Sequence, residues 1–168
     1  MGKSIKRLTL MGVMTALAML FSYVESLLPS FLPIPGARIG LANIVILLCL
    51  YVIGPREAFI VGIVRILLSA LLFGNIFSLC LSISGFVFSF LLTVFLYKRK
   101  VFSIPGISSG AGAFHNFGQV IAASFIVGNS KLLSSFVWFG ILGIVTGILT
   151  GFICKLVYER IFKYDWIS

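Results

Sequence analysis

The only histidine of the chain lies within a small polar group inside an otherwise apolar stretch. His115 is followed by the amide side chains of Asn116 and Gln119, and residues 110–119 also hold several glycines and alanines. In a helix, His115 and Gln119 share a face because side chains four residues apart point the same way. Imidazole and amide groups bind through hydrogen bonds and are costly at membrane depth. The stretch therefore predicts either one wall of a ligand site or an interhelical hydrogen-bond network.

Charged side chains also lie within or beside apolar stretches, at positions 25, 38 and 65. The forked donors of an arginine suit a carboxylate or a phosphate, and a nearby glutamate neutralises one of the two arginines. The alternative is a buried Arg65–Glu25 pair that only holds helices together. The predicted substrate-binding set is Glu25, Arg38, Asn43, Arg65, Asn75, His115, Asn116 and Gln119.

Catalytic and metal chemistry find little support in the sequence. Acidic residues are few, and no aspartate-rich motif is present that would bind a magnesium diphosphate. There is no phosphate-binding G-x-x-x-x-G-K-[ST] loop, no G-x-S-x-G and no H-E-x-x-H. The three cysteines lie singly, without the spacing of a zinc site. We therefore expect no catalytic residue, no metal and no cofactor, and a stand-alone enzyme is disfavoured.

The composition places the protein in a membrane. The chain is 60% hydrophobic and 10% charged, with a mean hydropathy of +1.19, whereas soluble domains carry about 25% charged residues. So much apolar surface cannot be buried within one small globule, so the surrounding solvent must be the lipid bilayer. The net charge of +9 comes from residues at the ends of apolar stretches rather than on one face, which argues against nucleic-acid binding.

Six apolar stretches predict an all-α integral membrane bundle of six transmembrane helices, forming a single domain over residues 1–168. A membrane-spanning helix needs about 20 residues, and proline and glycine separate the stretches. The first is expected to be an uncleaved helix rather than a signal peptide, because its apolar run continues well beyond the Ala-Leu-Ala at 16–18. The predicted helices are about 8–28, 37–53, 57–73, 76–97, 107–128 and 132–162.

The basic residues predict the orientation of this multi-pass bundle in the cell membrane. With both termini cytoplasmic, ten of the thirteen Lys and Arg residues lie on the cytoplasmic side, as the positive-inside rule requires. This topology places most of the polar side chains listed above in the outer half of the bundle, so we expect a pocket there that is open to the outside and lined by the first, second, third and fifth helices. The cytoplasmic set is Lys3, Lys6, Arg7, Arg56, Lys98, Arg99, Lys100, Lys155, Arg160 and Lys163.

Two stripes of small residues predict close helix contacts. Gly12 and Ala16 lie four residues apart in the first helix, and glycines recur at 140, 143, 147 and 151 in the sixth. Such faces let helix backbones approach each other. For the sixth helix we expect a contact within the bundle. For the first helix a contact within the bundle and docking of a partner subunit are both open.

Several motifs, in this order along the chain, resemble those of the heptaprenyl diphosphate synthase component I family, also called the Gx transporter family. More distantly, the layout resembles the substrate-binding S components of energy-coupling factor transporters, which are six-helix proteins with an outward-facing small-molecule site. The resemblance covers nearly the whole chain and rests on residues 25–29 (ESLLP), 35–43 (PGARIGLAN), 65–75, 84–85 and 110–119.

The resemblance implies two functions. As an S component, the chain is the membrane-embedded binding subunit of an uptake transporter, and it docks a transmembrane coupling subunit and ATPases through an alanine-x-x-x-alanine face that here reads Gly12 and Ala16. As a synthase component, it is a non-catalytic membrane subunit beside a soluble prenyltransferase in quinone biosynthesis. Both functions fit a ligand with an anionic head group, and an isoprenoid with such a head group is one example. The family also implies the plasma membrane of a bacterium.

Overall fold

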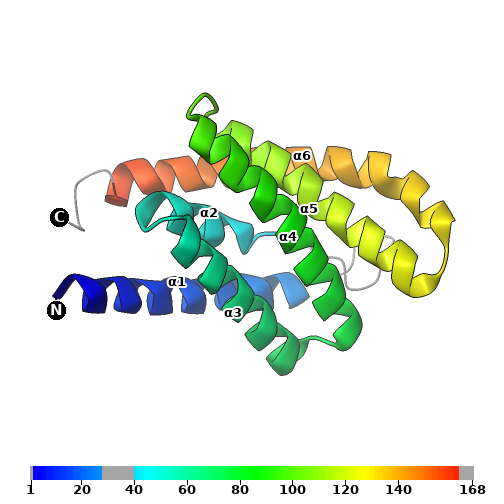
Figure 1. The fold of residues 1–168 in the computed structure, drawn as a ribbon, viewed down its shortest axis with the longest axis horizontal. Helices are drawn as coiled ribbons and strands as arrows, with labels where there is room; N and C mark the ends of the chain where they lie inside the picture. Colours follow the sequence, from blue (N-terminus) through cyan, green and yellow to red (C-terminus); the bar gives the residue numbers. More distant parts are fainter. Residues whose placement is uncertain (1, 28–39, 163–168) are drawn as a thin grey trace.

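The computed structural model describes residues 2–27 and 40–162, and these residues form helices joined by short turns (Figure 1). The predicted all-helical architecture is confirmed for this part of the chain. A 3₁₀ helix, Ser130–Ser135, precedes the last long helix, which continues into a π-helical turn, Tyr158–Phe162. The α-helices are α1 (Gly2–Leu27), α2 (Asn43–Val52), α3 (Pro55–Phe73), α4 (Ile76–Arg99), α5 (Ile104–Val127) and α6 (Phe136–Val157).

Local sequence signals account for most helix ends. The side chain of Asn75 accepts a hydrogen bond from the backbone N–H of Ser78, 2.7 Å away, while the Ser78 hydroxyl pairs with the backbone N–H of Asn75. This capping box satisfies backbone groups that the first turn of α4 leaves unpaired. Ser103 caps α5 in a similar way, and α5 ends at Gly128 with a φ of +68°, a conformation that favours glycine.

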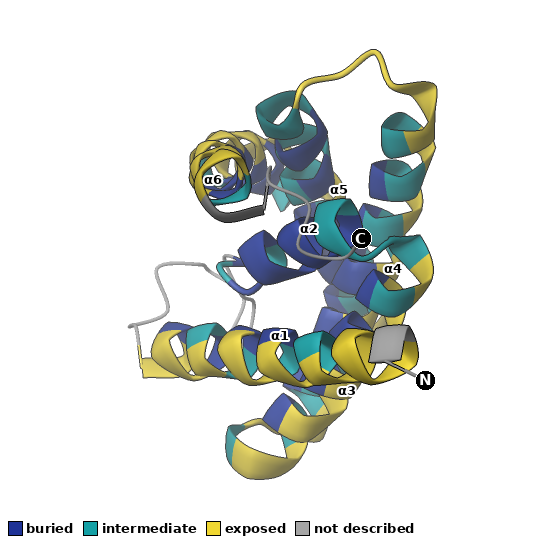
Figure 2. Ribbon diagram, turned by 90° about the vertical axis from the view of Figure 1, so that its left-hand side faces the viewer, coloured by how far each residue is buried: buried dark blue, intermediate teal, exposed yellow. Residues whose placement is uncertain are grey.

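The short helix α2 lies at the centre of the bundle, with the other five helices around it (Figure 2). Seven consecutive residues, Ile44–Leu50, are buried, and they form much of the larger apolar core. A helix that is apolar on every side is stable only in the interior of the protein or in lipid, and α2 lies in the interior. At ten residues, α2 is only about 15 Å long.

The predicted start of the second helix near residue 37 is wrong for the residues that the structure describes there. Gly40 has a φ of +95°, outside the helical region, and Leu41 and Ala42 form a turn before α2 begins at Asn43. The backbone N–H of Gly40 is directed to the carboxylate of Glu25 on α1 instead of into a helix. Residues 37–39 lie outside the described part of the chain.

Glycines bring α5 and α6 into direct backbone contact, which agrees with the contact expected within the bundle. A Cβ atom on Gly143 would lie 2.7 Å from the carbonyl carbon of Gly112, and one on Gly151 would lie 2.6 Å from the Cα of Pro105. Neither distance is tolerated by real side chains, so these positions require glycine for packing rather than for backbone flexibility. The two helices therefore form a closely packed pair.

This contact predicts different effects for two neighbouring glycines of α6. Gly143→Ala should destabilise the protein by about 1–3 kcal/mol, because the added methyl group overpacks a backbone contact. Gly140→Ala is the matched control, since a Cβ there lies an ordinary 3.7 Å from the ring of Phe136. Thermal unfolding in detergent should show a lower midpoint for Gly143→Ala alone. Equal midpoints for both variants would contradict the packing described here.

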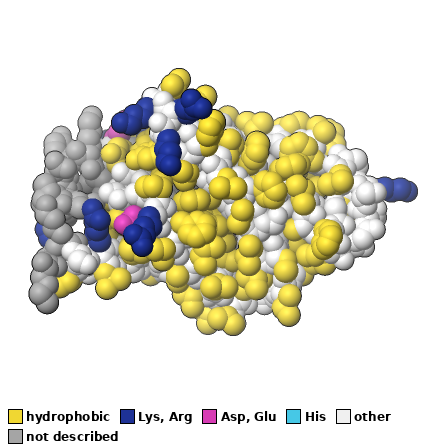
Figure 3. Space-filling model, in the orientation of Figure 1, with side chains coloured by type: hydrophobic (Ala, Val, Ile, Leu, Met, Phe, Trp, Pro, Cys, Tyr) yellow, Lys and Arg dark blue, Asp and Glu magenta, His cyan; other side chains and the backbone are white. Residues whose placement is uncertain are grey.

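Three helical segments are long and apolar enough to cross a membrane: Ser4–Leu27, Ile76–Arg99 and Ser130–Arg160. Large apolar side chains are exposed on the surface, including Leu71, Phe125 and Trp138, each more than three-quarters exposed. In Figure 3, hydrophobic side chains cover the visible face, and most Lys and Arg side chains lie towards the end where α1 begins and α6 ends. These features are those of a membrane-embedded protein.

Candidate functional site

A buried polar cluster surrounds Gly40, at the turn before α2. Glu25, near the end of α1, is only 7% exposed, and its Oε1 accepts a hydrogen bond from the backbone N–H of Gly40. Only glycine adopts a φ of +95° without strain, and a Cβ at this position would lie 2.8 Å from Nδ2 of Asn43. The missing side chain of Gly40 therefore lets α1, α2 and their polar groups come together.

Arg65 joins this cluster from α3. Its side chain is 3% exposed, and Nη1 donates a hydrogen bond to Oγ of Ser22, 3.2 Å away on α1. Ser22 lies one helical turn before Glu25, so both face the same side of α1. The charged side chains of Arg65 and Glu25 therefore both lie at the same short stretch of α1, residues 22–25, inside the bundle.

His115 completes the cluster from α5, where it is held between two glycines. A Cβ on Gly85 of α4 would lie 2.9 Å from Nδ1 and Cε1 of the imidazole, and one on Gly40 would lie 3.9 Å from its Cδ2. The Nε2 atom of His115 is 2.6 Å from Nε2 of Gln119. When the amide donates this hydrogen bond, the ring proton lies on Nδ1. The glycines leave space for the ring, and Gln119 fixes its orientation.

The remaining predicted site residues lie elsewhere. Asn116 is buried and donates a hydrogen bond from Nδ2 to the backbone oxygen of Phe139 on α6, 2.7 Å away, so it belongs to the α5–α6 interface. Asn75 is exposed and caps α4. Arg38 lies outside the described residues. The structure thus brings Glu25, Asn43 and His115 together at Gly40. Gln119 is connected to this group through His115, and Arg65 lies one turn along α1 from Glu25, at Ser22. Asn75 and Asn116 lie apart.

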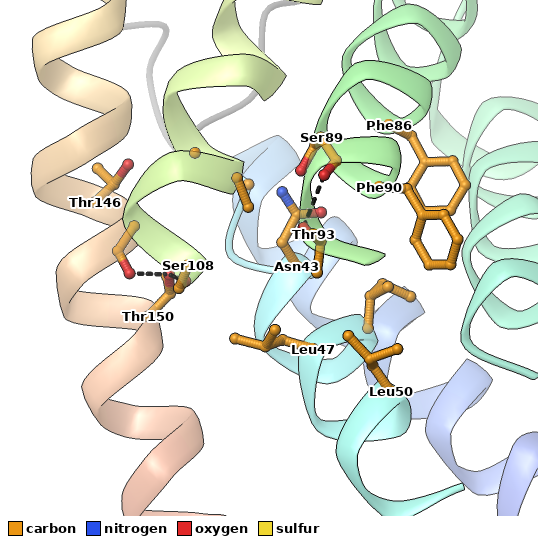
Figure 4. A pocket seen from close by; sticks show the side chains of 15 residues that line it. Asn43, Leu47, Leu50, Phe86, Ser89, Phe90, Thr93, Ser108, Thr146 and Thr150 are labelled. Atoms are coloured by element: carbon orange, nitrogen blue, oxygen red, sulfur yellow. Dashed lines mark hydrogen bonds between the residues drawn. The ribbon is translucent and has the colours of Figure 1, made fainter. Parts of the chain in front are cut away.

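A narrow pocket of about 30 Å³ begins at Gly40 and Asn43 and is shown in Figure 4. This volume is room for about two water molecules. Helices α2, α4, α5 and α6 line it, at the level of the first turns of α5. One wall is apolar and the other carries hydroxyl groups. The lining side chains include Ile46, Leu47, Leu50, Phe86, Ser89, Phe90, Thr93, Ser108, Ala111, Thr146 and Thr150.

The position of this pocket differs from the expected one. The sequence predicted a cavity between the first, second, third and fifth helices, whereas neither α1 nor α3 lines this pocket. The reason is packing: α1 and α3 contact each other through the Arg65–Ser22 hydrogen bond, and the space lies between α2, α4, α5 and α6 instead. The hydroxyl-bearing positions were missed, although Ser89 and Thr93, like Thr146 and Thr150, recur at the four-residue spacing of one helix face.

The hydroxyl groups of the pocket are already used within the protein. Thr93 donates to the backbone oxygen of Ser89 at 2.7 Å, and Thr146 donates to that of Leu142 at 2.9 Å. Ser108 and Thr150 lie 3.0 Å apart and bridge α5 to α6. Among the residues that the structure describes, no Lys, Arg, Asp or Glu side chain lines the pocket. Its surface is therefore uncharged and offers few free hydrogen-bond donors.

The described residues also bear on metal binding and on the predicted docking face of the first helix. Within residues 2–27 and 40–162, no three His, Cys, Asp or Glu side chains come together in a way that would hold a metal ion. Gly12 and Ala16 both lie on the exposed side of α1, and a Cβ on Gly12 would meet no described atom within 4 Å. This face of α1 is therefore open to a partner or to lipid.

Comparison with known proteins gives one family match. Residues 14–157 match the family model described as heptaprenyl diphosphate synthase component I, a span that includes the polar cluster and the pocket. No curated protein and no solved structure gives a significant match. The family model confirms the resemblance that the sequence motifs carry. The chain therefore belongs to the heptaprenyl diphosphate synthase component I family.

Proposed function

We propose that this protein is a non-catalytic, membrane-embedded binding subunit for a small molecule that carries an anionic group. The observation that carries the proposal is the set of buried polar side chains Glu25, Arg65, His115 and Gln119: Glu25 and His115 lie at Gly40, Gln119 contacts His115, and Arg65 contacts Ser22, one turn before Glu25. Ionisable side chains are costly within a bilayer, and where they occur they mostly mark sites of binding or transport. Packing alone would be served by neutral residues of similar size.

The chemistry of the cluster favours an anionic ligand. The Arg65 guanidinium binds carboxylates and phosphates through paired hydrogen bonds. The start of α2 adds the positive end of a helix dipole close by, and the Glu25 carboxylate contacts the backbone N–H of Gly40, three residues before α2. His115 and Gln119 supply further hydrogen bonds. Arg38 is a second arginine of the proposed site.

As the finer role, we propose the binding subunit of an uptake transporter, similar to the S components of energy-coupling factor transporters. In this role the six helices form a membrane-embedded bundle and both termini are cytoplasmic. The gathering of basic side chains at the end where α1 begins supports this orientation. The open face of α1 at Gly12 and Ala16 would dock the transmembrane coupling subunit that connects to the ATPases.

The family description favours a second role, as the membrane subunit of a heptaprenyl diphosphate synthase. In this role the chain binds an isoprenoid diphosphate, while a separate soluble prenyltransferase forms the bonds. The anionic site proposed here suits the diphosphate group, and the apolar surroundings suit the hydrocarbon chain. Both roles need the same binding site and differ in the partner protein.

Purification of the full-length protein from its native membrane in mild detergent separates the two roles. The transporter role predicts that ATPase subunits and a membrane coupling protein co-purify, and mass spectrometry would identify them. The synthase role predicts a soluble prenyltransferase with aspartate-rich motifs instead. Native mass spectrometry of the same sample should detect a bound anionic small molecule. A protein that carries neither ligand nor either partner would contradict the proposed function.

A further inference from the structure

The turn between α4 and α5 combines basic and apolar side chains at the surface. Lys98, Arg99 and Lys100 are consecutive and exposed. Val101 and Phe102 follow them, with exposed fractions of 80% and 50%; we call these five residues the basic turn. Three positive charges are costly within the hydrocarbon of a bilayer, and apolar side chains this exposed are unfavourable in water. The interface between the two accommodates both kinds of side chain.

The basic turn lies at the level of the lipid headgroups. The candidate membrane span of α4, Ile76–Arg99, has 24 residues, a length of about 36 Å that crosses a hydrocarbon core of about 30 Å. The residues that follow Arg99 therefore leave the hydrocarbon. Helices α1 and α6 hold the other two candidate spans and run along one axis in Figure 1, where their left-hand ends extend beyond the turn between α4 and α5. The basic turn thus lies at the side of the bundle, towards the surrounding lipid.

The charges of the basic turn have no carboxylate beside them among the residues that the structure describes. The one ion pair found there joins Lys155 and Glu159, 4.0 Å apart. The guanidinium of Arg99 instead lies 4.9 Å from the centre of the Phe95 ring. Such a cation–π contact uses the face of the guanidinium and leaves its in-plane N–H donors to bind an anion. At the bilayer interface, the abundant anions are the phosphate groups of lipids.

Lys100 occupies a position that suits glycine better. Its φ is +55°, and no other non-glycine residue in the described part of the chain has a positive φ. Helix α5 ends in the same left-handed conformation, but there the residue is Gly128, with a φ of +68°. A lysine costs stability in this conformation relative to glycine. Its presence is therefore better explained by its charge than by the geometry of the turn.

We propose that the basic turn binds the headgroup of an anionic phospholipid in the leaflet at this end of the bundle. The three basic side chains contact the phosphate group, and the two apolar side chains lie against the upper part of the acyl chains. An acidic protein surface would also match the charges, but the place of the turn at the side of the bundle and its exposed apolar pair favour lipid. Binding there does not depend on the proposed ligand site at Arg65.

The test is a titration of the purified full-length protein, in mild detergent, with two lipids that have identical acyl chains. Native mass spectrometry should show that anionic phosphatidylglycerol binds at least about tenfold more tightly than zwitterionic phosphatidylcholine, since each basic residue at a membrane surface contributes about fivefold. The triple variant Lys98→Gln, Arg99→Gln and Lys100→Gln should lose this preference. Equal affinity of the unmodified protein for the two lipids would overturn the lipid site in favour of a soluble acidic partner.

A matched control separates the basic turn from the basic character of the whole protein. Lys6→Gln, Arg7→Gln and Arg56→Gln together remove the same charge from exposed positions in the first turns of α1 and α3. This control should keep the preference for phosphatidylglycerol. A preference that survives the triple variant, or that the control loses to the same extent, would overturn the assignment to the basic turn.

Lys100→Gly separates lipid binding from folding. Glycine adopts the positive φ without strain, so the thermal unfolding midpoint should stay the same or rise. The affinity for phosphatidylglycerol should nevertheless fall about fivefold, and full affinity would contradict the role given to Lys100. Excess inorganic phosphate should not displace the bound lipid. Displacement would overturn the lipid site, because the basic turn would then bind free phosphate.

Discussion

Arg65→Ala is expected to weaken binding of inorganic diphosphate by at least about a hundredfold while leaving the protein inserted in the membrane. Arg65 is buried on α3 and is anchored to Ser22 of α1, so its guanidinium is already ordered before a ligand binds. Loss of one partner from a buried charge contact costs about 3–5 kcal/mol, and about 1.4 kcal/mol corresponds to a tenfold change in affinity. Isothermal titration in detergent would measure the loss.

Two further variants separate charge from geometry and from folding. Arg65→Lys keeps the positive charge but loses the forked donors, and it should bind with intermediate affinity. Arg56→Ala, on the same helix but exposed, is the control and should bind as tightly as the unmodified protein. Size-exclusion chromatography shows whether each variant remains monodisperse. Unchanged affinity in a monodisperse Arg65→Ala protein would remove Arg65 from the site.

The sequence predicts the helices well because each depends on local signals. Apolar runs are interrupted by residues that end helices, such as Gly54 before α3 and Gly128 after α5, both at positive φ. The short length and central position of α2 were not predictable in this way. A helix buried on all sides lacks an amphipathic stripe, and nothing local shows that Gly40 pairs with Glu25, which lies fifteen positions earlier. The contact between Gly40 and Glu25 depends on how α1 packs against the other helices.

The candidate site shows the same division. Polar residues in apolar stretches drew attention to Glu25, Arg65, His115 and Gln119, because burying such groups is costly wherever they lie, and all four are buried in the structure. The hydrogen-bond partner of each predicted site residue depends on packing and could not be predicted. Asn116, for example, contacts the backbone of α6, and Asn75 caps α4. The topology predicts how deep each residue lies in the membrane, but this depth does not show which helices enclose a pocket. The pocket therefore lies partly beside α6, for which the sequence predicted a helix contact at the glycines and nothing at the threonines.

Gly85→Ala is expected to have the second largest effect, because it displaces His115 without changing any polar group. The added methyl would lie 2.9 Å from two ring atoms and from the backbone oxygen of His115. We expect a loss of about 1–3 kcal/mol in the free energy of unfolding, as for other overpacked sites. Diphosphate affinity should fall about tenfold, because the ring and its partner Gln119 move away from Gly40.

A double-mutant cycle tests whether the effect of Gly85→Ala is caused by the contact with His115. In a His115→Ala background the ring is absent, and two of the three closest contacts of the new methyl group disappear. Gly85→Ala should then destabilise the protein less than it does alone, which gives a coupling energy of about 0.5–3 kcal/mol for residues in contact. Thermal unfolding of the four proteins in one detergent measures it. Additive effects would mean that Gly85 serves only the α4–α5 backbone contact and that His115 is held by other groups.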